Sequence, residues 1–194
     1  MSNVRVVLFT RYPEPGRAKT RLIPALGPRG AAELHRRLTE RTLAQVRAAE
    51  LPFEVRATGR PAEEFAAWLG DAPVVDQGEG DLGARMKRAG PPYPCIFIGA
   101  DAPDLTGEDL NDAARALRSH DAVIGPAEDG GYWLLGLSRP LDHLFDDMPW
   151  GTDQVLPLTL ARLAAAGTSP AMLRPLADLD RPEDLHRWPQ VAHD

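Results

Sequence analysis

Two kinds of hydrophobic pattern alternate along the chain. Short runs of branched apolar residues are typical of buried strands, and longer runs with apolar residues every three or four positions are typical of amphipathic helices. The pattern predicts strands at 4–10, 53–58, 74–76, 95–99, 121–125 and 132–137. It predicts helices at 29–50, 61–69, from Leu82 onward, 106–118, 152–166 and 181–187, with residues 11–28 as a loop. We expect Pro157 to kink the helix over 152–166.

This order of elements predicts an α/β fold. Strands that alternate with helices form a mainly parallel central sheet with helices on both faces, as in Rossmann-like proteins. No repeat or linker divides the sequence, so we expect residues 1–194 to form a single domain. In such sheets ligands bind outside the carboxyl ends of the strands, which is where candidate chemistry should lie.

Composition excludes several classes of protein. The 194 residues carry 22 Lys and Arg against 28 Asp and Glu, and this net charge of −6 argues against general nucleic-acid binding. The single cysteine, Cys95, excludes an internal disulfide and a cysteine-based metal site. There is no targeting segment and no apolar run near the roughly 20 residues of a membrane helix, so we expect a cytoplasmic protein.

Positive charge concentrates in the loop after the first strand. Residues 11–21 contain four cations, Arg11, Arg17, Lys19 and Arg21, together with Gly16 and Thr20. Such a loop can surround phosphate groups, since glycine permits close backbone approach and the cations offset the negative charge. It lacks the spacing of a Walker loop. A solvated turn is the alternative, but we favour an anion site.

A glycine-rich segment follows the third strand. Gly78, Gly80 and Gly83 match G-x-G-x-x-G, the pattern of a dinucleotide-binding turn. However, Glu79 and Asp81 would repel a pyrophosphate. A tight structural turn and a base-binding turn in which Gln77 contacts a nucleobase are the alternatives.

Carboxylates follow two further predicted elements. Asp101 comes directly after the most apolar strand and suits Mg²⁺, which prefers one or two protein carboxylates plus phosphate oxygens. A capping box at Thr106 and Asp109 leaves Asp101 available for that role. Asp178 and Asp180 alternate onto one side of an extended segment, but Asp180 and Glu183 also have capping-box spacing. Spacing alone therefore leaves Asp180 as a ligand or a helix cap.

Residues 128–133 combine acidic, glycine and aromatic residues. Asp129, Gly130, Gly131 and Tyr132 suit a polar substrate, with a carboxylate for hydroxyl groups and a ring for stacking. Asp-Gly-Gly also predicts a hairpin turn, and both interpretations are compatible. The histidines, Trp68, Trp188, Met86 and Cys95 are assigned to structural roles.

Taken together, these segments resemble a known family. The matching residues are Pro13, Pro15-Gly16, Lys19–Leu22, Gln77, Asp81–Gly83, Arg85-Met86, Gly99–Leu105, Gly125-Pro126, Asp129–Tyr132, Trp150, Asp178–Asp180 and Pro182–Leu185. They resemble the bacterial arsenosugar-biosynthesis or radical-SAM/selenodomain-associated glycosyltransferases. That family lies in the nucleotide-diphospho-sugar transferase (GT-A) superfamily, with the molybdopterin and phospholactate guanylyltransferases.

The resemblance implies a function and a set of site residues. It implies a metal-dependent transferase with Mg²⁺ or Mn²⁺, a nucleotide donor and a small-molecule acceptor. We expect glycosyl transfer from a nucleotide sugar; nucleotidyl transfer that releases pyrophosphate is the alternative. An NAD-dependent oxidoreductase and a non-catalytic nucleotide-binding module are lower alternatives.

The residue patterns and the resemblance together predict four groups of roles. The nucleotide-binding residues are Arg11, Gly16, Arg17, Lys19, Thr20, Arg21, Gln77, Gly78, Asp81 and Gly83. Asp101 and Asp180 are the metal ligands, and Lys19, Asp101 and Asp129 are the catalytic residues. Asp129, Gly130, Gly131, Tyr132 and Trp150 are the substrate-binding residues.

Overall fold

The computed structural model describes residues 4–193, and its strands and helices alternate as expected. The strands are β1 (Arg5–Arg11), β2 (Phe53–Thr58), β3 (Val74–Asp76), β4 (Cys95–Ile98), β5 (Ala122–Pro126), β6 (Tyr132–Leu137) and β7 (Ala171–Met172). The helices are α1 (Ile23–Ala48), α2 (Ala62–Leu69), α3 (Leu82–Ala89), α4 (Gly107–Ala116), α5 (Val155–Ala165) and α6 (Pro189–His193). Within this part of the chain, no helix is long and apolar enough to span a membrane.

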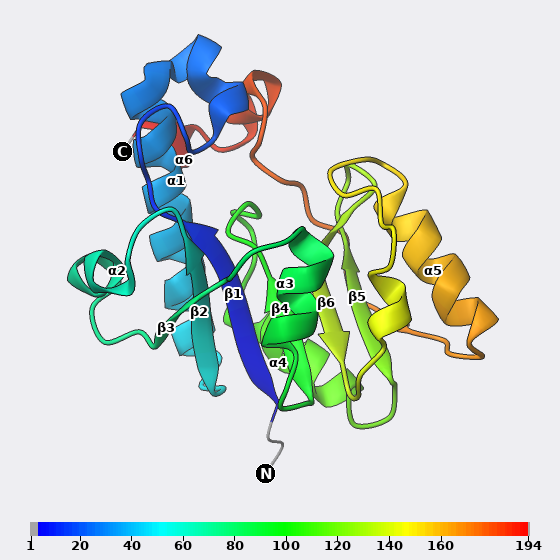
Figure 1. Cartoon of the computed structure of the whole chain (residues 1–194). Helices are drawn as coiled ribbons and strands as arrows, with labels where there is room; N and C mark the ends of the chain where they lie inside the picture. Colours follow the sequence, from blue (N-terminus) through cyan, green and yellow to red (C-terminus); the bar gives the residue numbers. More distant parts are fainter. Residues whose placement is uncertain (1–3, 194) are drawn as a thin grey trace.

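All seven strands belong to one mostly parallel sheet. Their order is β3-β2-β1-β4-β6-β5-β7, and β1 pairs in parallel with both β2 and β4. Only β6 runs against its neighbours, β4 and β5. The predicted α/β class with a mainly parallel sheet is confirmed. Since β1 and β4 are adjacent and parallel, the segments that follow them emerge at the same edge of the sheet (Figure 1).

Alternating side chains of the sheet form two cores. Val6 and Leu8 of β1 pack on the face covered by α1, α2 and α4, whereas Val7 packs on the face covered by α3 and α5. Both faces of the sheet carry apolar side chains that are buried from solvent, because helices cover the sheet on each side. Cys95 is fully buried in the second core, as expected, and burial raises the pKa of its thiol to about 12.

The loop predicted over 11–28 is shorter in the structure. Thr20–Leu22 forms a 3₁₀ turn, and α1 begins at Ile23. Gly27 interrupts this helix with a left-handed backbone (φ 71°), so Pro28 begins a second helical segment and removes no interior hydrogen bond. The predicted kink at Pro157 is wrong for a similar reason, because α5 begins at Val155 and Pro157 falls in its first turn.

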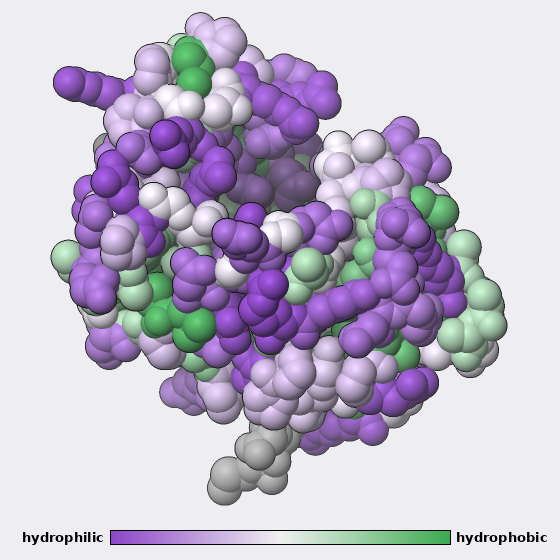
Figure 2. Space-filling view, viewed as in Figure 1, coloured by the Kyte–Doolittle hydropathy of each residue, from purple (hydrophilic) through white to green (hydrophobic). Residues whose placement is uncertain are grey.

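The sequence predicted only part of the secondary structure of the C-terminal segment. Residues 182–187 form a 3₁₀ helix where an α-helix was predicted, and β7 and α6 were missed because they span two and five residues. The segment packs Leu179 and Trp188 against Leu22 and Leu34, near the start of α1. These elements form a lobe above the carboxyl ends of the strands, and a hydrophilic hollow lies beneath it (Figure 2).

Candidate functional site

A cavity of about 440 Å³ opens at the carboxyl ends of β1, β2 and β4. Among its lining residues are Thr10, Arg11, Arg17, Lys19, Thr20, Arg21, His35, Thr58, Gln77, Leu82, Arg85, Asp101 and Asp180. Five are permanent cations and two are carboxylates, so the cavity is locally basic in a protein whose net charge is −6. Such a site attracts a small anion even though the chain as a whole repels polyanions.

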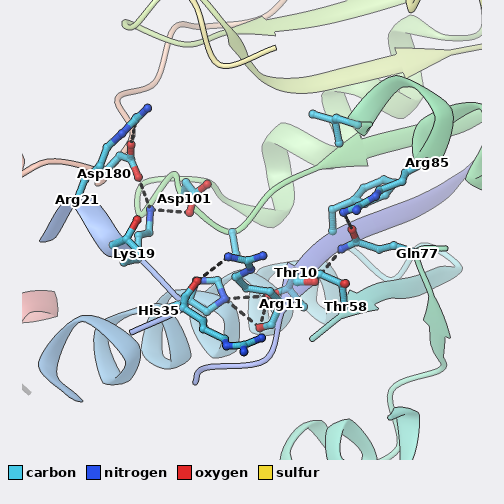
Figure 3. A pocket seen from close by; sticks show the side chains of 15 residues that line it. Thr10, Arg11, Lys19, Arg21, His35, Thr58, Gln77, Arg85, Asp101 and Asp180 are labelled. Carbon is cyan, nitrogen blue, oxygen red and sulfur yellow. Dashed lines mark hydrogen bonds and ion pairs between the residues drawn. The ribbon is translucent and has the colours of Figure 1, made fainter. Parts of the chain in front are cut away.

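Lys19 lies at the centre of the charged end of this cavity (Figure 3). Its side chain is only 3% exposed, and Nζ lies 2.6 Å from Asp101 Oδ1 and 3.5 Å from Asp180 Oδ1. Nζ also donates to the carbonyl of Leu179 at 2.6 Å. The backbone of Lys19 is left-handed (φ 47°), a conformation that costs a non-glycine residue about 1 kcal/mol or more. The loop therefore holds this lysine in a strained but fully bonded position.

The lysine and its carboxylate partner stabilise each other's charged form. Burial by itself lowers the pKa of Lys19, but the charges of Asp101 and Asp180 outweigh it and raise the pKa above its ordinary value. The Asp101 side chain is 52% exposed, and the partial loss of solvent around its carboxylate raises its pKa; the Lys19 ammonium outweighs this and holds the pKa below its usual value. Both groups remain ionised across the neutral range.

The structure shows that the side chain of Asp180 does not cap the turn over 182–187. Asp184 Oδ2 accepts from the backbone N–H groups of Asp180 and Arg181, so Asp184 caps the 182–187 turn. The predicted Asp180–Glu183 capping box is not formed. The Asp180 side chain instead bonds Arg21 at 2.5 Å. A backbone bond from Leu179 N to Asp101 O, 2.8 Å long, brings the two acidic segments together.

Gln77 and Arg85 form the opposite end of the cavity. Gln77 is 6% exposed, and its Nε2 donates to the carbonyls of Thr10 at 2.8 Å and Arg56 at 2.9 Å. Its Oε1 accepts from Arg85 Nη1 at 2.9 Å (Figure 3). Gln77 thus lines the cavity as predicted, but its amide bonds protein groups. Arg85 is among the residues that carry the family resemblance, but the sequence predicts no role for it. Its position in the cavity wall depends on the packing of α3.

The glycine-rich segment has structural reasons for its glycines. A Cβ on Gly78 would lie 2.5 Å from Arg88, which donates to the carbonyls of Gln77 and Glu79. A Cβ on Gly83 would lie 3.0 Å from Phe145. Asp81 caps α3 by accepting from Ala84 N at 2.8 Å. Gly78, Asp81 and Gly83 do not line the cavity, contrary to expectation, and an acidic cap disfavours a pyrophosphate at this helix.

The middle of the cavity wall contains a histidine that was assigned to a structural role. His35 of α1 is buried, and its Nε2 lies 3.0 Å from the carbonyl of Arg11 and 3.3 Å from Thr10 Oγ1. Burial is the main cause that lowers its pKa, so the ring is neutral near pH 7. No sequence signal pointed to it, because a lone histidine on a helix face is usually structural. Gly16 lies within the basic loop with φ +82°, and it does not line the cavity.

A second cavity of about 500 Å³ shares Arg21 and Asp180 with the first. Its other lining residues are Glu128, Asp129, Gly151, Thr152, Asp153, Ala177, Asp178, Arg181, Asp184 and Arg187. In this wall, Arg187 donates to both carboxylate oxygens of Glu128, at 2.7 and 3.2 Å. The two cavities together therefore provide a basic compartment and a more acidic one, which meet at Asp180.

Asp178 is a site residue that the predicted set omitted. Its side chain is half-buried between the second cavity and a small hollow beside Asp101 and Tyr132. Burial, followed by the charges of Asp101 and Asp129, raises the pKa of its carboxyl group to about 7. Alternation with Asp180 was the available signal, but the sequence could not show how many carboxylates meet here.

The predicted substrate-binding residues separate into two groups. Asp129 lines the second cavity, and its Oδ1 accepts from Gly131 N at 2.9 Å within the hairpin between β5 and β6. Gly130 is left-handed (φ +90°), and a Cβ there would meet Asp153 at 2.6 Å. The hairpin interpretation is thus confirmed.

The two aromatic residues of the predicted set are mainly packed in the protein. Tyr132 is largely buried, and burial raises the pKa of its hydroxyl, which contacts Thr159. Trp150 stacks on Phe145 with ring centroids 6.4 Å apart. Trp150 lines neither large cavity, contrary to the expectation that it contacts substrate. Its position follows from the packing of α3, which the sequence could not reveal.

The carboxylates at the junction fit a hard divalent cation. Asp101 and Asp180 both approach one cationic group, the Lys19 ammonium, so their oxygens converge on one point. No cluster of three or more candidate ligands exists in residues 4–193. Two carboxylates suit Mg²⁺ or Mn²⁺ when phosphate oxygens and water complete the coordination.

Comparison with known proteins identifies the family. A family model described as an uncharacterized protein conserved in bacteria, DUF2064, matches residues 39–152, which is more than half of the chain. This chain belongs to the DUF2064 family. The matched residues include Gln77, Arg85, Asp101 and Asp129, but not the basic loop. Among curated proteins, no match was found.

Solved structures share the fold of this DUF2064 protein. A Desulfovibrio desulfuricans G20 protein, provisionally named a nucleotide-diphospho-sugar transferase, is 28% identical, with a TM-score of 0.88 over 99% of this chain and 97% of its own. A 4-diphosphocytidyl-2C-methyl-D-erythritol synthase is 10% identical, with a TM-score of 0.64 and 98% of each chain covered.

A third structure contains ligands. Glucosyl-3-phosphoglycerate synthase from Mycobacterium tuberculosis, in complex with Mn²⁺, UDP and glucosyl-3-phosphoglycerate, is 14% identical, with a TM-score of 0.56 over 97% of this chain and 75% of its own. These neighbours are transferases. The fold of the DUF2064 chain is that of nucleotide-diphospho-sugar transferases, as the resemblance implied.

Proposed function

We propose that this DUF2064 protein is a metal-dependent transferase that takes a nucleotide sugar as donor and transfers the glycosyl group to a small acceptor. The observation that supports this most is the pair of cavities that meet at Asp180. The first is lined by five cations suited to phosphate groups, and the second has carboxylates suited to hydroxyl groups. A donor sugar at the junction would face both.

Each charged residue of the first cavity has a proposed role. Arg17, Lys19 and Arg21 bind the phosphates, since their side chains can donate hydrogen bonds to phosphate oxygens and offset part of the negative charge. Asp101 and Asp180 hold Mg²⁺ or Mn²⁺, which supplies charge stabilisation to the leaving phosphate when bound. Lys19 then exchanges part of its contact with these carboxylates for a phosphate oxygen.

The second cavity is the proposed acceptor site. Asp129 keeps one carboxylate oxygen that has no hydrogen-bond partner among residues 4–193, and it can accept from a hydroxyl group. Exclusion of water from the junction would favour transfer to the acceptor over hydrolysis. The narrower membership in the arsenosugar or selenodomain-associated group, and the acceptor that it would imply, belong to this proposal.

Nucleotidyl transfer is the second candidate. It is favoured by the five cations that line the first cavity, because a triphosphate carries more charge than a nucleotide sugar. Structural neighbours include both kinds of transferase. The dinucleotide alternative loses support, because Gly78 and Gly83 have packing roles and Asp81 occupies the helix N-terminus.

A ligand screen tests the proposal. We expect nucleoside diphosphates and nucleotide sugars to raise the melting temperature in the presence of Mg²⁺ or Mn²⁺, because a ligand that binds only the native state stabilises it. Lys19→Met should abolish the shift, and Asp101→Asn should abolish its metal-dependent part. Arg36→Lys, on the exposed face of α1, is the matched control and should retain the shift.

Product analysis then separates the two reactions. Release of a nucleoside diphosphate from a nucleotide sugar supports glycosyl transfer, whereas release of pyrophosphate from a triphosphate supports nucleotidyl transfer. Stabilisation by NAD(H) without metal, or no shift with any nucleotide, would contradict the proposal.

A further inference from the structure

The hydrogen bonds of Gln77 leave its amide little capacity to contact a ligand. A glutamine amide has two N–H donors, and here both point to backbone carbonyls, those of Thr10 and Arg56. A flipped amide would place its oxygen against the same two carbonyls, so the orientation is fixed. The carbonyl oxygen of Gln77 therefore faces Arg85, to which it is bonded.

Arg85 is held at two points and keeps most of its donors. Its Nη1 donates to Gln77, and its Nε donates to the carbonyl of Gly80 at 3.0 Å. A guanidinium has five N–H donors, so three have no hydrogen-bond partner among residues 4–193. Arg88 braces the same loop through the carbonyls of Gln77 and Glu79. The guanidinium is thus a pre-positioned donor group on the cavity wall.

An apolar surface lies beside this group. Leu82 lines the cavity and is 40% exposed, which makes it one of three large apolar side chains that are exposed in the described part of the chain. Leu82 lies three residues before Arg85 on α3, so the two side chains are neighbours on the helix surface. An apolar side chain on which a flat ring can pack, beside free hydrogen-bond donors, suits a nucleobase, whereas the Lys19 end suits phosphates.

We propose that Arg85 reads the donor's base and that Gln77 is a positioning residue that holds Arg85 for this purpose. This rests on the proposed function, that the cavity binds a nucleotide, and it names the class of base. The parallel donors of a guanidinium match two adjacent acceptors, as arginine matches O6 and N7 of guanine. Cytosine offers a similar pair in O2 and N3. Neither adenine nor uracil has two adjacent acceptors, so we expect them to bind more weakly.

The test compares four nucleoside diphosphates by calorimetric titration in the presence of Mn²⁺. For the wild-type protein we expect either GDP or CDP to bind at least tenfold more tightly than ADP and UDP. The comparison of GDP with CDP then identifies the preferred base. Pyrophosphate, which lacks a base, measures the phosphate end alone. Arg85→Lys keeps the positive charge but replaces the fork with a single ammonium group.

The variants separate the role of Arg85 from general damage. Arg85→Lys should reduce the preference to about threefold or less and leave pyrophosphate affinity unchanged. Gln77→Leu should do the same, because Arg85 loses one of its two anchors. Arg115→Lys is the control, because Arg115 forms an exposed ion pair with Glu108 on α4. This variant should retain the full preference.

The outcomes distinguish this inference from the function on which it rests. If all four diphosphates bind equally, or if Arg85→Lys keeps the preference, the inference about Arg85 is wrong while nucleotide binding stands. A preference for ADP or UDP overturns it as well. If neither pyrophosphate nor any diphosphate binds, the proposed function itself fails.

Discussion

The half-buried carboxyl group of Asp178 predicts that a neutral substitution stabilises the protein. Its pKa rises from 3.8 to about 7, first because of burial and then because Asp101 and Asp129 lie near it. Between these two pKa values the native protein binds more protons than the unfolded chain. The stability contributed by this group is therefore complete in acid and is lost as the pH rises from about 4 to about 7.

The magnitude follows from the pKa difference. At about 1.4 kcal/mol per pKa unit, the ionised carboxylate costs the folded state about 4 kcal/mol above pH 7. Because Asp178 is half-buried and lines two cavities, we reduce this figure by half, to about 2 kcal/mol. Asn has nearly the same shape as Asp and no charge. We therefore expect Asp178→Asn to stabilise the protein by about 2 kcal/mol at pH 8.

Thermal unfolding at several pH values measures this effect. For a chain of this size, about 2 kcal/mol corresponds to a rise in Tm of about 4–8 °C at pH 8. At pH 4 the native carboxyl group is already protonated, and the rise should be about 1 °C or less. Asp71→Asn, at a side chain that is 94% exposed, is the control and should show no such dependence on pH.

One result would refute the reasoning. If Asp178→Asn changes Tm by the same amount at pH 4 and pH 8, the carboxyl group does not titrate near neutrality in the folded protein. A decrease in Tm at pH 8 would show that the carboxylate is stabilised there by Lys19 more strongly than burial and its acidic neighbours destabilise it.

Three further predictions concern single contacts. Lys19→Met should lower the free energy of unfolding by about 1–2 kcal/mol at pH 7 in urea titrations, because Asp101 loses its partner. This loss of stability should shrink as the pH falls through the lowered pKa of Asp101. A loss that does not change with pH would contradict this explanation. Trp133→Phe should lower the free energy of unfolding by about 1–2 kcal/mol more than Trp150→Phe does. The reason is that Trp133 Nε1 donates to the carbonyl of Arg174, whereas Trp150 Nε1 is buried with no partner among the described residues. Equal losses of stability in the two variants would contradict this. Gly83→Ala should destabilise the protein by about 1–3 kcal/mol, since a Cβ would press on Phe145, and an unchanged Tm would show that α3 can move.

The strands and long helices followed from sequence because their signals are local. The apolar run before Gly99 and the periodicity of α1 need no knowledge of the rest of the chain, and the capping box at Thr106 and Asp109 formed as predicted. The basic loop was also visible, because four cations occur within a few residues. Glycine and proline positions were less informative. The effects of Gly27 and Pro157 depend on where a helical segment begins, and tertiary packing determines that position.

Only the tertiary structure decided which polar groups meet. Lys19 and Asp180 are separated by 161 positions in the sequence, yet a backbone bond between Leu179 and Asp101 and the packing of Leu179 against α1 bring them together. Local spacing could not distinguish a ligand from a cap at Asp180, because both choices satisfy the same short-range pattern. Gln77 shows the same limit, since its donors are used by strands that are distant in sequence. The sequence determined where charge and apolar surface occur, and the fold determined which of them are neighbours.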